Sequence, residues 1–84
     1  MGRARRYQPA KLAKKLLQIR KRLGLSQGQL FKRLEGCGAS IHPPHISGYE
    51  SGISEPPLPV LLRYAELAGV STDVLINDSM DLPK

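Results

Sequence analysis

Apolar residues at helical spacing, cut into short blocks by glycine and proline, constrain the fold of this chain more than any other feature. The first block has leucine or isoleucine at positions 12, 16, 19 and 23, and spacings of four, three and four residues keep these side chains on one face of a helix. Gly24, Gly52 and Gly69 follow the ends of such blocks, where glycine commonly ends a helix. The alternation typical of strands never persists. The sequence therefore predicts an all-α fold, a compact bundle of about five helices.

The positions of glycine, proline and capping residues also predict where each helix lies. We expect helices from Pro9 to Leu23, from a Ser26 cap to about Leu34, over residues 43–51 with His42 as the cap, over 58–68, and a last helical turn that starts at Ser71 or Thr72. Leu58 and Leu62 are expected on or near the core side of the fourth helix. With 84 residues the chain has room for one small domain. We divide it into a flexible basic arm over 1–8, a helical domain over 9–78 and a frayed tail over 79–84.

Charge is distributed unevenly along the chain. Residues 1–34 contain eleven lysines or arginines and no acid, and the whole chain has a formal net charge of +6. Such a balance favours polyanions, with acidic proteins and anionic membrane surfaces as weaker alternatives. The basic residues of the first helix are expected mainly on its solvent side, namely Lys11, Lys14, Lys15, Lys21 and Arg22. A helix capped by Ser26 would present backbone N–H groups that suit a phosphate. These features together predict a nucleic-acid binder.

Several other classes of protein fit the sequence poorly. No apolar run approaches the length of a membrane span, and the N-terminus lacks the hydrophobic region of a signal peptide. The single Cys37 excludes an intramolecular disulfide and is compatible with a reducing compartment, so we expect a cytoplasmic protein without a membrane association.

A metal or catalytic site is also not expected. Cys37, His42 and His45 do not have the spacing of a closed structural zinc site, and Pro43 and Pro44 restrict the histidine geometry. A Cys37–His42 pair would lack the third group that orients a catalytic base. The sequence therefore predicts no enzyme, no cofactor, no metal and no small-molecule substrate.

An ordered set of residues runs through four of the expected helices. It consists of Arg20 four residues before Gly24, then Leu25-Ser26-Gln27-x-x-Leu30, then Ile46-Ser47-x-x-Glu50-x-Gly52-x-x-x-Pro56-x-Leu58-x-x-Leu61, then Ala65, and last Val70-Ser71-x-Asp73-x-Leu75. On these positions, residues from about 16 to 78 resemble the Cro/repressor-type (XRE-type) helix-turn-helix family of DNA-binding regulators. The resemblance implies that the third helix docks in the major groove of double-stranded DNA. It also implies a sequence-specific transcriptional regulator, more a repressor than an activator.

The resemblance also implies roles for individual residues. Gln27, at the start of the second helix with Ser26, would hydrogen-bond a phosphate or a base edge. Tyr49 would pack beneath the third helix or reach a phosphate, and Arg20 and Glu50 would form a structural ion pair. The outward positions of the third helix are Pro43, Pro44, His45, Ser47, Gly48 and Ser51, of which His45 and Ser47 are the strongest candidates for DNA contacts. The arm would either enter a minor groove or remain solvated, through Arg3, Arg5 and Arg6.

The chain departs from the family pattern in the turn before the third helix. Seven positions separate Leu34 from Ile41 where the family has about two, so residues 35–40 are an insertion of about five residues. Two prolines and Gly48 replace the long polar side chains that usually read bases. One alternative is therefore a domain that keeps this fold and has lost specific DNA binding.

Two kinds of protein partner remain open at this point. A homodimer would use Val74, Leu75 and Ile76 as its interface, although Val74 and Leu75 can equally complete the core. The alternative function is an antitoxin-like interaction module that binds a partner protein as well as DNA.

Overall fold

The computed structural model describes residues 11–36 and 41–83, and within these residues it contains five helices and no strand. The helices are α1 (Leu12–Leu23), α2 (Gln27–Leu34), α3 (Pro44–Ser51), α4 (Leu58–Ala68) and α5 (Thr72–Ile76). The predicted all-α fold of about five helices is confirmed. Helices α2, α3 and α4 begin and end within two residues of the predicted bounds, α1 ends at Leu23 as predicted, and α5 begins at Thr72, one of the two predicted starts. Pro9, the expected start of the first helix, lies outside the described residues.

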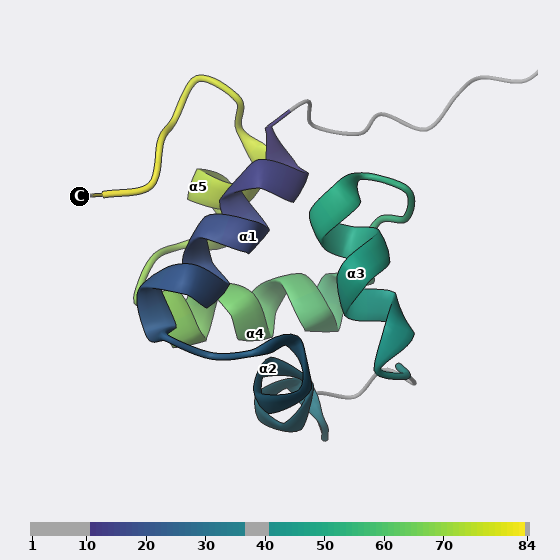
Figure 1. Ribbon diagram of the computed structural model, residues 1–84. Coiled ribbons are helices and arrows are strands. Elements are labelled where there is room, and N and C mark those ends of the chain that lie inside the picture. Colours follow the sequence, from purple (N-terminus) through teal and green to yellow (C-terminus); the bar gives the residue numbers. More distant parts are fainter. Residues whose placement is uncertain (1–10, 37–40, 84) are drawn as a thin grey trace, which may run out of the picture.

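Helix α1 lies at the centre of the bundle, where it contacts α3, α4 and α5 (Figure 1). Helix α2 packs against α3 and α4. The core is built from one face of each helix, and its fully buried side chains are Leu16, Ile19, Leu30, Leu34, Ile46, Val60, Tyr64 and Leu75. Burial of this apolar area is the main source of stability in a domain of this size.

The link between α1 and α2 is only three residues long. Gly24 adopts a left-handed conformation with φ 72°, which a residue with a Cβ adopts only at a cost. Its N–H donates to the carbonyl of Lys21, and the N–H of Leu25 donates to the carbonyl of Arg20. This tight turn fixes the start of α2 relative to α1.

The core side of α4 differs from the prediction. Val60, Leu61 and Tyr64 are buried, whereas Leu58 is 79% exposed and Leu62 is 52% exposed. Positions 58 and 62 are one turn apart and share a face that lies next to the buried one. The expectation that Leu58 and Leu62 lie on the core side is therefore wrong, and both leave apolar surface open to solvent.

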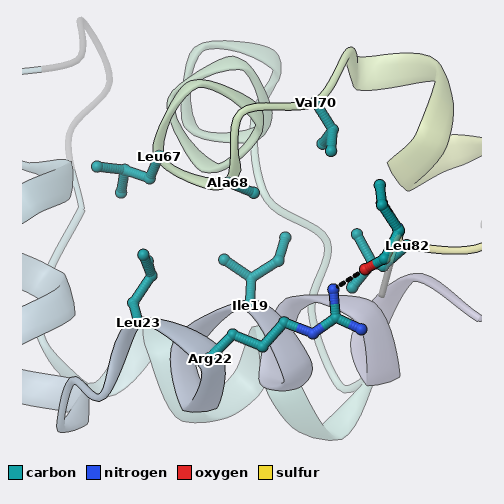
Figure 2. A pocket seen from close by; sticks show the side chains of 8 residues that line it. Ile19, Arg22, Leu23, Leu67, Ala68, Val70 and Leu82 are labelled. Carbon is teal, nitrogen blue, oxygen red and sulfur yellow. Dashed lines mark hydrogen bonds between the residues drawn. The ribbon is translucent and has the colours of Figure 1, made fainter.

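Part of the tail that was predicted to fray contacts the bundle, through Met80, Leu82 and Pro83. Leu82 is buried and lies near Ile19 and Val70, beside a groove between α1 and α4 (Figure 2). The guanidinium of Arg22 donates to the carbonyl of Pro83. The tail is held because Leu82 is an apolar anchor. It is hard to recognise in the sequence because most of its neighbours are polar or small.

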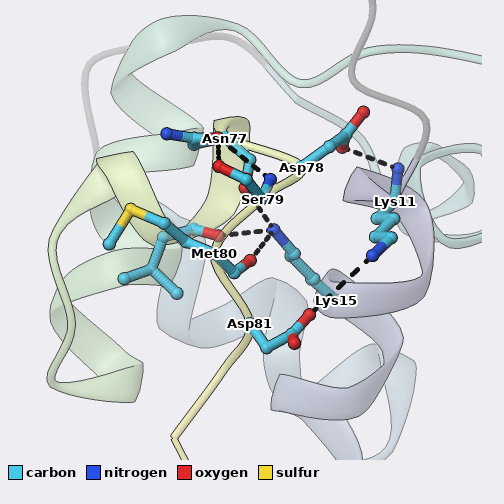
Figure 3. A network of polar contacts seen from close by, with 8 residues as sticks. Lys11, Lys15, Asn77, Asp78, Ser79, Met80 and Asp81 are labelled. Carbon is cyan, nitrogen blue, oxygen red and sulfur yellow. Dashed lines mark hydrogen bonds and ion pairs between the residues drawn. The ribbon is translucent and has the colours of Figure 1, made fainter.

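Lys15 is also placed differently from the prediction, since its side chain is only 3% exposed. Its Nζ donates to the carbonyls of Val74 at 2.7 Å, Asn77 at 3.0 Å and Met80 at 2.6 Å (Figure 3). Position 15 shares a helix face with Leu12, Leu16 and Ile19, which explains why it points inward. Lys15 is therefore a structural residue and not a solvent-facing cation.

The acids near the C-terminus are likewise engaged with α1. A carboxylate oxygen of Asp78 accepts a hydrogen bond of 3.1 Å from the backbone N–H of Lys11, and Asp81 lies 4.0 Å from Lys11 Nζ. Negative charge at the start of a helix is favourable because the helix dipole is positive there.

Helix α5 divides the three residues that were expected to form a dimer interface. Leu75 is fully buried and Val74 is partly buried against the core, while Ile76 is 42% exposed. Leu75 therefore completes the core, and Ile76 is the member of the three that remains on the surface. None of the described helices is both long and apolar enough to cross a membrane.

Candidate nucleic-acid interface

The N-terminus of α2 is closed by a capping box. Ser26 Oγ accepts from the backbone N–H of Gln29 at 3.1 Å, and Gln29 Oε1 accepts from the backbone N–H of Ser26 at 2.8 Å. This reciprocal pair satisfies two of the N–H groups that a helix start leaves without partners. Residues 26–28 are exposed, so the positive end of the α2 dipole faces solvent, where a phosphate is favourable.

Arg20 on α1 and Glu50 on α3 form a two-pronged ion pair. Arg20 Nε lies 2.6 Å from Glu50 Oε2, Arg20 Nη2 lies 3.2 Å from Glu50 Oε1, and Arg20 Nη1 donates to the carbonyl of Leu25 at 3.0 Å. The Glu50 side chain is only 6% exposed. The hydrogen bond with Glu50 raises the pKa of Arg20, so the pair stays charged. The pair ties α3 to α1 and to the link before α2.

Gln27 completes this network from α2. Its Nε2 donates to Glu50 Oε1 at 3.1 Å, so one carboxylate joins residues of three helices. The sequence placed Gln27 and Glu50 in the site separately but gave no sign that they meet, because 23 positions separate them.

The exposed face of α3 begins with two prolines. Pro43 is the N-cap residue and Pro44 the first helical residue, which corrects the expectation that His42 is the cap. His42 nevertheless contributes, since its backbone N–H donates to His45 Nδ1 at 3.1 Å and its carbonyl accepts from the His45 N–H at 2.9 Å. A neutral His45 that accepts at Nδ1 carries its proton on Nε2. It therefore presents a donor on the exposed face.

Two predicted DNA-contact residues of α3 lie elsewhere than on its open face. Tyr49 is buried in the core, which matches the packing role left open for it. Gly48 lies against the turn that follows α3, and a Cβ there would come within 2.5 Å of Ser54 Oγ. The Gly48 carbonyl also accepts from the Ser54 N–H at 3.2 Å. The side chains that α3 exposes are then Pro43, Pro44, His45, Ser47 and Ser51.

A buried tyrosine is found near the ion pair. Within residues 11–36 and 41–83, the hydroxyl of Tyr64 is the buried side-chain polar atom that has no hydrogen bond. Burial raises the pKa of Tyr64 well above its usual range, and the negative charge of Glu50 raises it further. Tyr64 is therefore a neutral side chain next to the network. The sequence predicted that Tyr64 lies in the core but did not indicate that Arg20 and Glu50 are its neighbours.

Most basic residues of the described chain lie on the surface. The exposed cations of α1 and α2 are Lys14, Lys21, Arg22, Lys32 and Arg33. The arm residues Arg3, Arg5 and Arg6, and Cys37 in the enlarged turn, lie outside the described residues. Their roles stay predictions.

The comparisons with known proteins agree with this geometry. A family model described as helix-turn-helix, HTH_3, matches residues 16–75, which is 60 of the 84 residues. No curated protein and no solved structure matches the chain significantly. The matched segment runs from the middle of α1 to α5 and includes Arg20, Gln27 and Glu50. Enzymatic activity is not typical of this family. The chain therefore belongs to the Cro/C1-type (XRE-type) helix-turn-helix family of DNA-binding domains.

Proposed function

We propose that this protein is a sequence-specific, double-stranded DNA-binding transcriptional regulator that represses by covering an operator. The observation that carries the proposal is the exposed polar face of α3 beside the capped N-terminus of α2, with both helices joined through Glu50. Two short helices presented in this way match the dimensions of a major groove.

Each part of the surface has a distinct role in this proposal. The N-terminus of α2, with Ser26, binds a phosphate through backbone N–H groups. His45 donates from Nε2 to a base acceptor or a phosphate, and Ser47 and Ser51 donate or accept. Pro43 and Pro44 make apolar contact with thymine methyl groups, since proline has no N–H to donate.

Selection from a random duplex pool at near-physiological salt, followed by sequencing, tests sequence specificity. We expect one enriched motif for the wild-type chain. Ser47→Ala should weaken or change the preference at one position of that motif. Ser71→Ala is the matched control, because Ser71 lies at the start of α5 and makes no side-chain cap bond. Recovery of unenriched DNA would contradict the proposal and leave binding to the backbone only.

The salt dependence of binding tests the electrostatic part separately. If about six phosphates are contacted, the slope of log K against log salt should be near −5. A slope shallower than about −2 would contradict phosphate contacts by α1 and α2. Lys32→Gln should reduce the slope by about one if Lys32 contacts a phosphate.

Repression is tested on DNA that carries the selected motif. The motif is placed either over a promoter or well upstream of it, and transcripts are counted with and without the protein. We expect fewer transcripts only from the overlapping site, because the proposed mechanism is occlusion of the promoter. Activation from the upstream site would contradict a repressor. A cytoplasmic location and the absence of catalytic activity belong to this proposal.

We further propose that two copies bind together through the α4–α5 apolar surface, which comprises Leu58, Pro59, Leu61, Leu62, Thr72 and Ile76. Leu58, Leu62 and Ile76 leave an apolar area open to water, and such areas are typical of interfaces. Paired half-sites in DNA also require a two-fold protein.

Sedimentation at micromolar concentration tests the dimer. We expect a dimer for the wild-type chain and a monomer for Leu62→Glu. Ile53→Glu makes the same chemical change at an exposed residue outside this surface and should leave the dimer intact. A monomeric wild-type chain would contradict the dimer. Copurification of a different protein on the same surface would favour the antitoxin-like alternative.

A further inference from the structure

The carboxylate of Glu50 fixes which way the amide of Gln27 points. A carboxylate has no hydrogen to donate, so the group that faces Glu50 Oε1 at 3.1 Å must be the amide nitrogen of Gln27. The amide oxygen of Gln27 then lies on the other side of the amide carbon. Gln27 is exposed, and among the described residues its side chain bonds to Glu50 only, so it is Glu50 that sets this orientation.

Glu50 cannot readily turn away from this arrangement. Its Oε2 accepts from Arg20 Nε at 2.6 Å, and its Oε1 also accepts from Arg20 Nη2 at 3.2 Å. The backbone of Gln27 is held as well, since it follows Ser26 directly in the capping box of α2. The amide orientation is therefore set before any DNA arrives, and such preorganisation lowers the entropy cost of binding.

The atoms that remain available on Gln27 select a type of partner. The amide oxygen accepts a hydrogen bond and the second amide N–H donates one, so a partner that uses both atoms must offer a donor beside an acceptor. A phosphate offers acceptors only and would use the N–H alone. The exocyclic amino groups of adenine and cytosine are the donors in the major groove. Adenine matches best, because the second amide N–H of Gln27 can donate to adenine N7 while the oxygen accepts from N6.

We propose that Glu50 is a positioning residue that turns the amide of Gln27 toward the amino edge of a base in the major groove. This inference rests on the proposed function and adds a base contact from α2 to those of α3. The Arg20–Glu50 pair then serves recognition as well as the fold.

The test uses the full chain and four proteins: wild type, Gln27→Ala, Glu50→Gln and the double variant. Each is measured on the duplex that the wild type selects and on duplexes with each base pair exchanged. We expect Gln27→Ala to bind the selected duplex about tenfold more weakly, within the range for one bidentate base contact, and to lose its preference at one base pair. Glu50→Gln should lose the same preference although Gln27 is present. The double variant should bind no more than about twofold more weakly than Glu50→Gln, because both changes remove one interaction.

Matched controls separate positioning from charge and from stability. Glu66→Gln makes the same acid-to-amide change on the exposed face of α4, and Gln18→Ala removes an exposed glutamine from α1. Both should keep the preference at every base pair. Circular dichroism at the binding temperature shows whether each variant is folded.

A second variant is informative even if Glu50→Gln fails to fold. Gln27→Lys places an ammonium beside Glu50 at an exposed position, and it has no acceptor for a base amino group. We expect it to lose the preference at the same base pair. Tighter binding with that preference intact would overturn the inference, because it would assign Gln27 to a phosphate.

The outcomes for the two proposals can be told apart. If the wild type selects a motif but Glu50→Gln keeps every preference, or if the losses in the double variant simply add, the inference is overturned and the proposed function stands. If the wild type selects no motif, the proposed function fails and the inference fails with it.

Discussion

Helix α1 carries two cations that are largely shielded from solvent, Lys15 and Arg20, and their main partners differ. Lys15 donates to three backbone carbonyls of the α5 end and the tail, whereas Arg20 meets a carboxylate with two nitrogens and a backbone carbonyl with a third. An ammonium has three donors that can be aimed in separate directions, so it can gather carbonyls from an irregular segment. A guanidinium is planar, so it fixes the direction of one carboxylate. The Lys15 contacts hold the end of α5 and the tail against α1, and the Arg20 contacts fix the orientation of the Glu50 side chain.

The C-terminal end of α5 shows why an ammonium is needed there. The helix has five residues, too few to be stable alone, and its last carbonyls carry the negative end of its dipole. Lys15 neutralises this end by bonding to Val74 within the helix and to Asn77 at its C-cap. Helix α5 therefore depends on α1 as much as on its own residues.

The largest effect is expected from Lys15→Met, which keeps the apolar stem and removes the charge. Three partly buried carbonyls lose their donor, and bonds to charged groups contribute about 1.5–3 kcal/mol, so we expect a loss of about 3 kcal/mol in the free energy of unfolding. Urea denaturation measures it. Lys14→Met, on the exposed side of α1, should change stability by less than about 0.5 kcal/mol. Equal effects at both positions would contradict the structural role of Lys15.

Replacing the guanidinium of Arg20 by an ammonium tests whether the planar group is needed there. Arg20→Lys keeps the positive charge and loses the second prong on Glu50, so we expect a loss of about 1–2 kcal/mol in the free energy of unfolding. Arg63→Lys is the control, because Arg63 makes a single exposed contact of 4.0 Å with Glu66. An Arg20→Lys protein as stable as the wild type would show that charge alone suffices at this position.

The start of α2 tests whether a neutral capping side chain stabilises a helix end, as the charged Lys15 does at the end of α5. Ser26→Ala removes the acceptor for the Gln29 N–H and should lower the free energy of unfolding by about 1 kcal/mol. Thermal unfolding measures it. Ser71→Ala removes an N-cap serine whose side chain makes no cap bond, so a loss of less than about 0.5 kcal/mol is expected. A larger loss at Ser71 than at Ser26 would reverse this ranking.

The smallest effect at neutral pH is expected from Tyr64→Phe, which removes a buried hydroxyl without a hydrogen bond next to the Arg20 network. We expect a change of less than about 1 kcal/mol, in the stabilising direction. The difference grows in alkali. Burial raises the pKa of Tyr64 in the folded state above its unfolded value of about 10, so the folded chain holds its proton more tightly.

The sign of the pH effect follows from that shift. The Tyr64 contribution is fully present below about pH 10 and is lost as the pH rises through the folded-state value. Urea denaturation at pH 7 and at about pH 11 should show wild-type stability falling more steeply than that of Tyr64→Phe. Parallel curves would mean that the hydroxyl is accessible to solvent in the folded chain.

The fold followed from local patterns, which explains what the sequence predicted well. Helix bounds depend on glycine, proline and capping residues near each end. The inward face of α1 was indicated by apolar residues that recur about every 3.6 positions. Lys15 was misplaced because its charge was weighed above its position on that face. The contact of Leu82 with the core was not predicted, because one apolar residue among small and polar residues is a weak local signal.

The site was less predictable because its geometry depends on distant residues. Ser26 was predicted from its capping chemistry, and the Arg20–Glu50 pair from the family resemblance. The bond between Gln27 and Glu50 was not, since no pattern along the chain records that α2 and the end of α3 come together. Gly48 was placed on the DNA-facing side by helix position, but its contact with Ser54 depends on the path of the turn after α3.

The Lys15 contacts have a consequence for how long the folded chain survives. Its three bonds join positions 59, 62 and 65 residues apart, so each closes a loop that contains most of the described chain and is costly in entropy to form early. Interactions of this kind are usually absent from the folding transition state, where their loss speeds unfolding and leaves the folding rate nearly unchanged. We therefore expect Lys15→Met to raise the unfolding rate more than it lowers the folding rate, which shortens the lifetime of the native state and exposes the chain to slow proteolysis.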